Sequence, residues 1–259
     1  MNVDVIGKLN EAIKDNIKVA YVTLTKSTGS APGRTGNTML VYEDGSIVGT
    51  CGGGNVEYTM IQEALECMKN NTPKSFKYKL EDIGMVCGGE VEGFIDVMKN
   101  DKNLIIVGGG HIGSKLYSLA LELGFTVTVV DDREEFANKD KYPEAKVFSG
   151  EYKNILSELT INDSYVVIVS RGHDTDYESL RSLIQRDYKY LGLIGSKRKV
   201  IKILGDLKEE GINSDDYENL YAPIGLDIAR NEPAEIALSI MAEILLIKNN
   251  GTLKHMRKR

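Results

Sequence analysis

Two short segments of the sequence place a cysteine directly before a run of glycines. Residues 51–57 read CGGGNVE, and residues 87–92 read CGGEVE. Glycines after a cysteine leave its sulfur unshielded and let a bulky ligand approach backbone N–H groups, while a thiolate suits a soft or high-valent metal centre. The alternative is that both loops are tight turns with inert cysteines. The candidate ligand-binding residues of these loops are Cys51, Gly52, Gly53, Cys87, Gly88 and Gly89.

A third irregular segment, residues 25–40, reads TKSTGSAPGRTGNTML. Its hydroxyl groups and the guanidinium of Arg34 could bind an anion. Loops of this composition are usually only turns. Arg34 is therefore an anion-binding candidate whose role depends on where the fold places the segment.

The sequence IIVGGGHIG, residues 105–113, is typical of a dinucleotide-binding loop. Gly108 permits the tight turn, Gly110 lets a phosphate approach the backbone, and Gly113 lets the helix pack closely on the strand. The helix N-terminus then offers free N–H groups to an anion. The alternative is a scaffold that keeps its turn glycines for packing alone.

Two further residues decide which ligand this loop would take. Asp131 ends the next strand and could accept hydrogen bonds from a ribose, which favours NAD over NADP, while Arg133 nearby leaves that choice open. His111 lies inside the loop, where it could contact a phosphate or cap the helix. NAD or another nucleotide is the ligand that this motif predicts.

Other catalytic constellations are sparse, because the chain has only 3 histidines and neither GxSxG nor HExxH. His173 follows a predicted strand, at the edge where open α/β sheets bind ligands. Together with Asp174 and Asp176 it could form a general-base pair. The alternative is that an Asp of this segment caps the next helix and its neighbour is solvated.

The elements that would position these residues fall into two domains. Residues 1–100 predict a small α+β domain, in which strands and a hairpin with an Asp44-Gly45 turn surround a helix that begins with Asn55 as N-cap. The first helix should carry Ile6, Leu9, Ile13 and Ile17 on its apolar face. The short polar stretch KNDKN, at residues 99–103, marks the boundary.

Residues 101–259 alternate short apolar runs with helical patterns. Continuous apolar strands alternating with helices predict a Rossmann-like, doubly wound parallel sheet covered on both faces. A closing helix begins at Pro233 and repeats apolar residues at helical spacing. The fold class expected for the whole chain is therefore α/β.

Composition restricts the partners. A net charge of −6 and a pI of about 5.3 argue against a nucleic-acid-binding surface. The 3 cysteines form no CxxC pair, so neither a disulfide framework nor a structural zinc site is expected, and a reducing cytoplasm fits. No apolar run reaches the ~18 residues of a membrane span, and the first residues do not resemble an export signal.

Seven segments together resemble the XdhC/CoxI family of molybdenum-hydroxylase accessory proteins. In chain order they are GSAPGRTGNTMLV, GTCGGGNVE, GMVCGGEVEGFID, IIVGGGHIG, VVDDREEFAN, LGLIGSKRK and APIGLDIARNEPAEIALSI. The resemblance implies a maturation factor that binds molybdenum cofactor (molybdopterin), supports its sulfuration by a cysteine desulfurase and inserts it into an enzyme such as xanthine dehydrogenase. It also implies that Cys87 contacts the molybdenum centre or its sulfur. We further expect a homodimer that covers the exposed glycine loops.

Two other hypotheses remain at this point. One is an NAD-dependent oxidoreductase that uses the Gly108 loop, with His173 and Asp176 as the proton-transfer pair. The other is a redox or nucleotide sensor in which Cys51 and Cys87 respond to oxidation.

Overall fold

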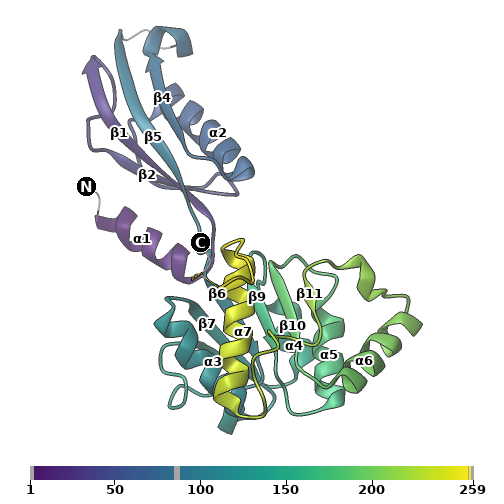
Figure 1. The fold of residues 1–259 in the computed structure, drawn as a ribbon. Helices are drawn as coiled ribbons and strands as arrows, with labels where there is room; N and C mark the ends of the chain where they lie inside the picture. Colours follow the sequence, from purple (N-terminus) through teal and green to yellow (C-terminus); the bar gives the residue numbers. More distant parts are fainter. Residues whose placement is uncertain (1–2, 85–87, 256, 258–259) are drawn as a thin grey trace. The chain divides into compact units, whose positions relative to one another are not determined.

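The structure is a computed structural model that describes residues 3–84, 88–255 and 257. The chain forms two units, Met1–Asn100 and Asp101–Arg259, which we call unit 1 and unit 2. Each unit has its own sheet and its own helices (Figure 1).

Unit 1 is built on a five-stranded antiparallel sheet with the order β3-β2-β1-β5-β4. The strands β2 and β3 form the hairpin expected around Gly45, which has a φ of 82°. The elements are α1 (Val3–Lys14), β1 (Val19–Gly29), β2 (Thr38–Tyr42), β3 (Ile47–Gly49), α2 (Gly54–Asn70), β4 (Lys74–Lys79), η1 (Leu80–Ile83) and β5 (Gly89–Met98).

The strand β1 shows why unit 1 has a helix on each face of its sheet. Ala20 and Val22 belong to the core under α2, whereas the neighbouring Val19 belongs to the core under α1. Successive side chains of a strand point to opposite faces, so one apolar strand serves both cores. The strand β1 also pairs with β5, and after a register shift between Leu24 and Lys26 the end of β1 lies beside the start of β5.

The buried face of α1 differs from the predicted one. Val5 and Ala12 are buried in the core, with Leu9 partly buried beside them. Ile6 is 40% exposed, and the helix ends before Ile17. Two apolar stripes compete on this helix, and contact with β2 and β3 selects the one that contains the smaller side chains.

Unit 2 contains a six-stranded parallel sheet with the order β11-β10-β9-β6-β7-β8. The chain proceeds outward from β6 through β8 and then returns to pair β9 with β6, so the strand order reverses between β6 and β9. The elements are β6 (Asn103–Val107), α3 (His111–Glu122), β7 (Thr126–Asp131), η2 (Glu134–Phe136), β8 (Lys146–Ser149), α4 (Tyr152–Glu158), β9 (Tyr165–Ile168), α5 (His173–Leu183), β10 (Tyr190–Leu193), α6 (Lys197–Glu209), η3 (Ser214–Asp216), β11 (Leu220–Tyr221) and α7 (Pro233–Lys248).

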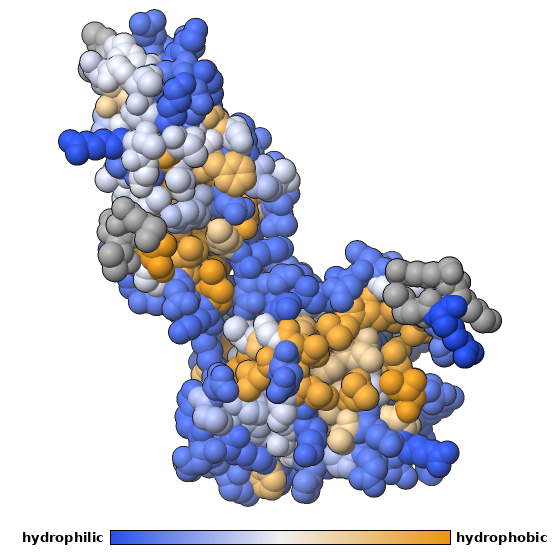
Figure 2. Space-filling view, turned by 60° about the vertical axis from the view of Figure 1, so that its left-hand side comes forward, coloured by the Kyte–Doolittle hydropathy of each residue, from blue (hydrophilic) through white to orange (hydrophobic). Residues whose placement is uncertain are grey.

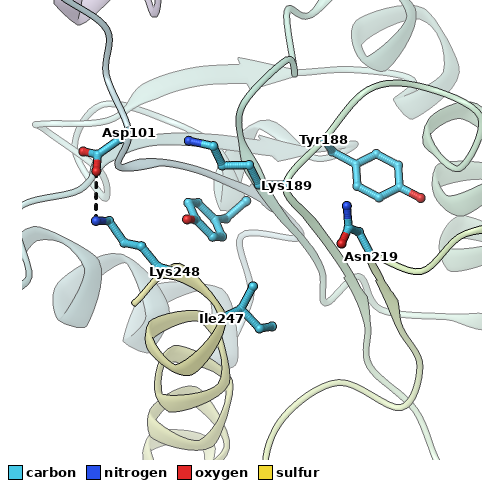
Figure 3. A pocket seen from close by; sticks show the side chains of 7 residues that line it. Asp101, Tyr188, Lys189, Asn219, Ile247 and Lys248 are labelled. Carbon is cyan, nitrogen blue, oxygen red and sulfur yellow. Dashed lines mark ion pairs between the residues drawn. The ribbon is translucent and has the colours of Figure 1, made fainter. Parts of the chain in front are cut away.

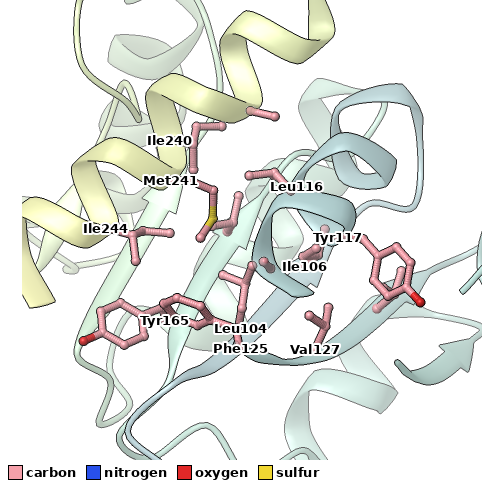
Figure 4. Packing of buried hydrophobic residues seen from close by; sticks show 14 of the residues in the cluster. Leu104, Ile106, Leu116, Tyr117, Phe125, Val127, Tyr165, Ile240, Met241 and Ile244 are labelled. Carbon is pink, nitrogen blue, oxygen red and sulfur yellow. The ribbon is translucent and has the colours of Figure 1, made fainter. Parts of the chain in front are cut away.

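Helices cover both faces of this sheet, as the doubly wound pattern predicts. On one face α3 and α7 pack over Leu104 and Ile106 of β6, and Figure 4 shows Leu116, Met241 and Ile244 converging on these strand residues. On the other face α4, α5 and α6 pack over the alternate side chains of the same strands. The carboxyl ends of β6 and β9 are therefore fixed from both sides.

Candidate functional site

Three irregular segments of unit 1 meet at the carboxyl end of β1. The Ser30 N–H donates to the Gly88 carbonyl oxygen over 3.0 Å, and the Asn55 side chain donates to the Ile83 carbonyl oxygen over 3.3 Å. A Cβ at Gly52 would lie only 2.7 Å from the backbone nitrogen of Gly33, so the loop before α2 touches the Gly33 turn. The described parts of the three loops that the sequence singled out separately thus lie next to one another.

The N-terminus of α2 opens onto the surface of these loops. Its N-cap is Gly53, with a φ of 80°, and no described side chain caps it. The predicted cap at Asn55 is wrong, because Asn55 lies inside the helix and its side chain reaches Ile83 instead. A Cβ at Gly53 or Gly54 would meet no atom within 4 Å, so these glycines border open space. Free helical N–H groups there attract anions.

Glu57, in the first turn of α2, holds the loop in shape. Its carboxylate accepts hydrogen bonds from the Thr50 hydroxyl and from the Cys51 N–H, the latter over 3.2 Å. The Gly52 N–H in turn donates to the Thr50 hydroxyl over 3.1 Å. A side chain that binds the preceding backbone from the first helical turn fixes the direction of chain entry.

Cys51 points away from this surface. Its side chain is 0% exposed and packs in the core with Val22 and Met60. Burial, and next the carboxylate of Glu57, raise the pKa of Cys51 to about 12. The sulfur is therefore a protonated thiol at neutral pH, and it does not reach a ligand on the loop surface in this conformation.

The other predicted residues of unit 1 lie at the surface or outside the described part. Cys87 lies outside the described residues, and its neighbour Gly88 is exposed. Gly89, at the start of β5, pairs with Gly29 at the end of β1, and its backbone lies close to Thr28. Arg34 is exposed.

In unit 2, the glycines of the loop after β6 are explained by close backbone approach. A Cβ at Gly108 would lie 2.4 Å from the Val169 carbonyl oxygen, and one at Gly113 would lie 2.1 Å from the Gly108 carbonyl oxygen. Gly110 is different, because a Cβ there would meet nothing within 4 Å. Gly110 is the N-cap of α3 and His111 is its exposed first residue, so this N-terminus also borders open space.

Asp131 is turned into the protein. It is 1% exposed, and one carboxylate oxygen accepts from the Gly109 N–H over 2.8 Å. The other oxygen accepts from the N–H and the Nε of Arg133, over 3.1 and 3.0 Å. Lys141 and Tyr142 both donate to the Gly109 carbonyl oxygen, over 2.6 and 2.8 Å. Asp131 therefore holds the N–H of Gly109, while Lys141 and Tyr142 hold its carbonyl oxygen, so these three side chains fix the glycine loop.

Sequence reasoning did not identify Arg171, which follows β9. Its guanidinium lies 2.7 Å from a carboxylate oxygen of Asp132, which follows β7. Because β6 lies between β7 and β9 in the sheet, this exposed ion pair joins the two strands that flank the glycine loop. The signal in the sequence was an arginine placed directly after an apolar strand.

Asp176 lies behind the same edge of the sheet and is fully buried. Its two oxygens accept hydrogen bonds from the Ser170 hydroxyl and from the ammonium of Lys199. Burial raises the pKa of Asp176, and the bonds from Lys199 and Ser170 oppose this rise. Lys199, in the first turn of α6, is the second residue that sequence reasoning missed.

His173 and Asp176 have separate partners. The Nδ1 of His173 lies 3.3 Å from Asp174, and its Nε2 lies 3.8 Å from Asp206 on α6. The N-cap of α5 is Gly172, so the alternative prediction of an Asp cap is wrong. The arrangement favours structural contacts of His173 at the start of α5.

A cavity of about 330 Å³ lies at the opposite edge of this sheet, where the parallel strands begin. Figure 3 shows Lys189 and Lys248 on its wall, with Lys248 paired to Asp101 at 2.9 Å. It is separated from the glycine loop by the length of the strands. Among the described residues, no group of three or more His, Cys, Asp or Glu side chains could hold a metal ion, and no helix is long and apolar enough to span a membrane.

Both units match known protein families. Residues 104–244 match the XdhC Rossmann domain, and residues 12–79 match the XdhC and CoxI family. The chain belongs to the XdhC and CoxI family. The XdhC Rossmann match spans the Gly108 loop, Asp176 and Lys199, and the XdhC and CoxI match spans the Cys51 loop but ends before Cys87.

Three curated relatives resemble the chain. It is 35% identical to the uncharacterized protein YqeB of Escherichia coli over 253 residues, which cover 95% of this chain and 46% of YqeB. It is 28% identical to a probable xanthine dehydrogenase subunit of Bacillus subtilis, over 59% of this chain and 44% of that protein. It is 22% identical to the molybdenum cofactor insertion chaperone PaoD of Escherichia coli, over 92% of this chain and 86% of PaoD. The chain thus spans about half the length of the first two relatives.

Proposed function

We propose that this protein binds molybdenum cofactor and delivers it to a molybdenum hydroxylase of the xanthine dehydrogenase type. Membership of the XdhC and CoxI family and similarity to a molybdenum cofactor insertion chaperone support this proposal. The cofactor is cargo in this proposal, and the protein is a carrier.

The observation that carries the proposal is the convergence of three loops in unit 1. Molybdenum cofactor is an anionic pterin that bears a phosphate, so it needs N–H donors and room for its rings. The uncapped N-terminus of α2 supplies the donors, and Gly53 and Gly54 leave the space in front of them open. We assign Cys87, next to the exposed Gly88, as the soft ligand of the metal centre or its sulfur.

Arg34 and the loop of unit 2 complete the proposed contacts. The exposed guanidinium of Arg34 would bind an anionic group at the unit 1 surface. The N-terminus of α3, at Gly110 and His111, would bind a phosphate or a nucleotide. Asp131 is engaged by the loop itself, and this favours a phosphate over the ribose of NAD as the group bound there.

The remaining steps belong to the same proposal. The bound cofactor would receive its terminal sulfur from a cysteine desulfurase before insertion into the hydroxylase. This sequence of events would take place in the cytoplasm. We expected a homodimer that covers the glycine loops, and we propose its contact at a different surface, the outward face of α7.

Anaerobic binding of molybdenum cofactor tests the proposal. Purified protein is incubated with the cofactor and freed of the unbound fraction, and the retained pterin is measured by the fluorescence of its oxidised product. We expect retention near one pterin per chain, reduced at least tenfold in Cys87→Ala. The matched control is Cys67→Ala, which removes a buried thiol on α2 and should retain the pterin.

Titrations with NAD⁺ and NADH on the same samples test the rival hypothesis of an NAD-dependent oxidoreductase. Retention that is lost with Cys87 and kept without Cys67 supports the carrier role. Tight NADH binding without any retained pterin would contradict the carrier role and favour a dehydrogenase. Circular dichroism of each variant shows that lost retention is not lost folding.

A further inference from the structure

The helix α7 is mostly apolar, and unit 2 covers only part of its surface. Ile240 and Ile244 are buried against the sheet and α3. Its polar side chains Glu235, Ser239 and Glu243 are spaced four residues apart and form one stripe. An apolar row beside this stripe stays exposed, and exposed apolar surface of this kind marks an interaction site.

The outward side of α7 is formed by the row Ala234, Leu238, Ala242 and Leu246, spaced four residues apart. Leu238 is 54% exposed, Ala234 is also exposed, and the other two are partly exposed. None of the four belongs to the core cluster under α7. Figure 2 shows apolar residues gathered over the face of unit 2 that carries this helix.

We propose that this row binds the same row of a second copy of the chain, with the two helices antiparallel about a two-fold axis near residue 240. Side chains spaced four residues apart lie on one face of a helix and form a ridge that a second helix can contact. The row alternates small and large, Ala-Leu-Ala-Leu. An antiparallel two-fold pairing places Leu238 opposite Ala242 of the second copy, and Ala234 opposite its Leu246. Each leucine then meets an alanine, as an isologous interface requires.

The charges at the ends of α7 are also self-complementary. Asp227, Arg230, Glu232 and Glu235 are exposed at or just before its N-terminal end, which leaves that end net negative, and Lys254 is exposed just beyond its C-terminal end. Such an arrangement suits the helix dipole of one chain. In the antiparallel pair it also brings the acidic end of each helix to the basic end of the other, whereas a parallel pair would bring like charges together.

Two exposed apolar residues lie close in sequence to the two ends of α7. Ile228, before α7, is 63% exposed, and Leu253, after α7, is 74% exposed. An antiparallel pair brings these two ends together. Because a stable interface buries about 1,200–2,000 Å² and one helix pair supplies only part of this area, we expect a dimer with a Kd in the micromolar range.

The test is sedimentation equilibrium of the full chain from about 1 to 200 μM, with four variants. Leu238→Glu should give a monomer over this range, since it places a charge in the contact. Ile201→Glu is the matched control, because Ile201 is 71% exposed on α6, and this variant should dimerise like the parent chain. Thermal unfolding shows that each variant is folded.

A compensating exchange tests the register. Ala242→Leu alone places leucine opposite leucine and should raise the Kd at least tenfold. The double variant Leu238→Ala, Ala242→Leu restores a leucine opposite an alanine and should return the Kd to within about threefold of the parent value.

Other occupants of the row give different results. If unit 1 of the same chain or another protein covers it, the parent chain stays monomeric at 200 μM and the proposal fails. If a dimer forms but Leu238→Glu leaves it intact, the interface lies elsewhere. If Ala242→Leu weakens the dimer and the exchange does not restore it, the antiparallel register is wrong.

Discussion

Asp176 and Lys199 form a charge pair in which one partner is fully buried and the other is partly exposed. Removing only the cation leaves an uncompensated carboxylate in the protein interior. We expect Lys199→Met to lower the free energy of unfolding by about 3–5 kcal/mol at pH 7. The double variant with Asp176→Asn should recover most of this loss, because the amide is neutral. Urea denaturation followed by circular dichroism measures both values.

The stability of the Lys199→Met variant should depend on pH in a defined direction. Burial raises the pKa of Asp176 in the folded protein, and without Lys199 this rise is larger. A carboxyl group with a raised folded pKa favours folding at pH values below its unfolded pKa, near 4, and this advantage is lost as the pH rises. The single variant should therefore regain stability relative to the parent chain as the pH falls from 7 toward 4. A constant difference would show that Asp176 does not change its charge there.

Cys51 allows a second prediction at the residue scale. Because burial raises its pKa to about 12, its thiol should react with a disulfide reagent at pH 8 at least ~100-fold more slowly in the native protein than in guanidinium. Cys51→Ala should remove one thiol from the denatured count and none from the rapid native count. Rapid native labelling that disappears in Cys51→Ala would show that the loop opens.

At this scale the sequence predicts local backbone turns, but not the contacts between side chains that are distant in sequence. The spacing of Gly108, Gly110 and Gly113 is local, so it predicted a turn that the fold contains. The direction of the Cys51 side chain is decided by contacts with Val22 and Asn37, which are distant in sequence. Of the two partners of Asp176, Ser170 lies in the loop after β9 and Lys199 lies 23 residues away on α6, so no single sequence pattern reveals the pair.

At the scale of elements, alanine substitutions at Gly113 and at Gly110 should change the folding free energy by very different amounts. Gly113→Ala places a Cβ 2.1 Å from the Gly108 carbonyl oxygen, so α3 must move from β6, and we expect a loss of about 2–4 kcal/mol of folding free energy. Gly110→Ala meets open space at a φ of −74° and should be within about 0.5 kcal/mol of the parent chain. Thermal and urea denaturation measure both variants.

The same pair of variants tests the role of the loop. Because Gly110→Ala leaves the fold intact but narrows the space before the N-terminus of α3, it should weaken retention of molybdenum cofactor or a phosphate if either binds there. Unchanged retention would remove the unit 2 loop from the binding site. Gly113→Ala cannot answer this question, since its effect on binding would follow from unfolding.

The sequence predicted the strands with continuous apolar side chains and missed an edge strand and two short elements. The apolar strands β6, β7, β9 and β10 have continuous buried side chains, so composition alone indicated a parallel sheet. The elements β8, α4 and β11 were not predicted, because β8 is an edge strand with exposed residues and the other two are short. In α1 two stripes were available, and only tertiary contact decided between them.

At the scale of the whole molecule, the hydrophobic cores follow the two units. Among the described residues, the two clusters under α1 and α2 contain only residues of unit 1, and the two clusters around the parallel sheet contain only residues of unit 2. The family matches follow the same division, at residues 12–79 and 104–244. Cooperative unfolding depends on shared packing, so the stability of each unit should be set within that unit.

Calorimetry of the full chain tests this independence. We expect Gly113→Ala to lower the unfolding temperature of unit 2 by roughly 5–15 °C, given ~2–4 °C per kcal/mol for a unit of this size, and to leave the unit 1 transition within about 1 °C. Hydrogen exchange assigns each transition, because amides of β1 and β5 report on unit 1 and those of β6 and β9 report on unit 2. A destabilisation that appears equally in β1 and β6 would mean that the two cores unfold together, which their separate packing does not predict.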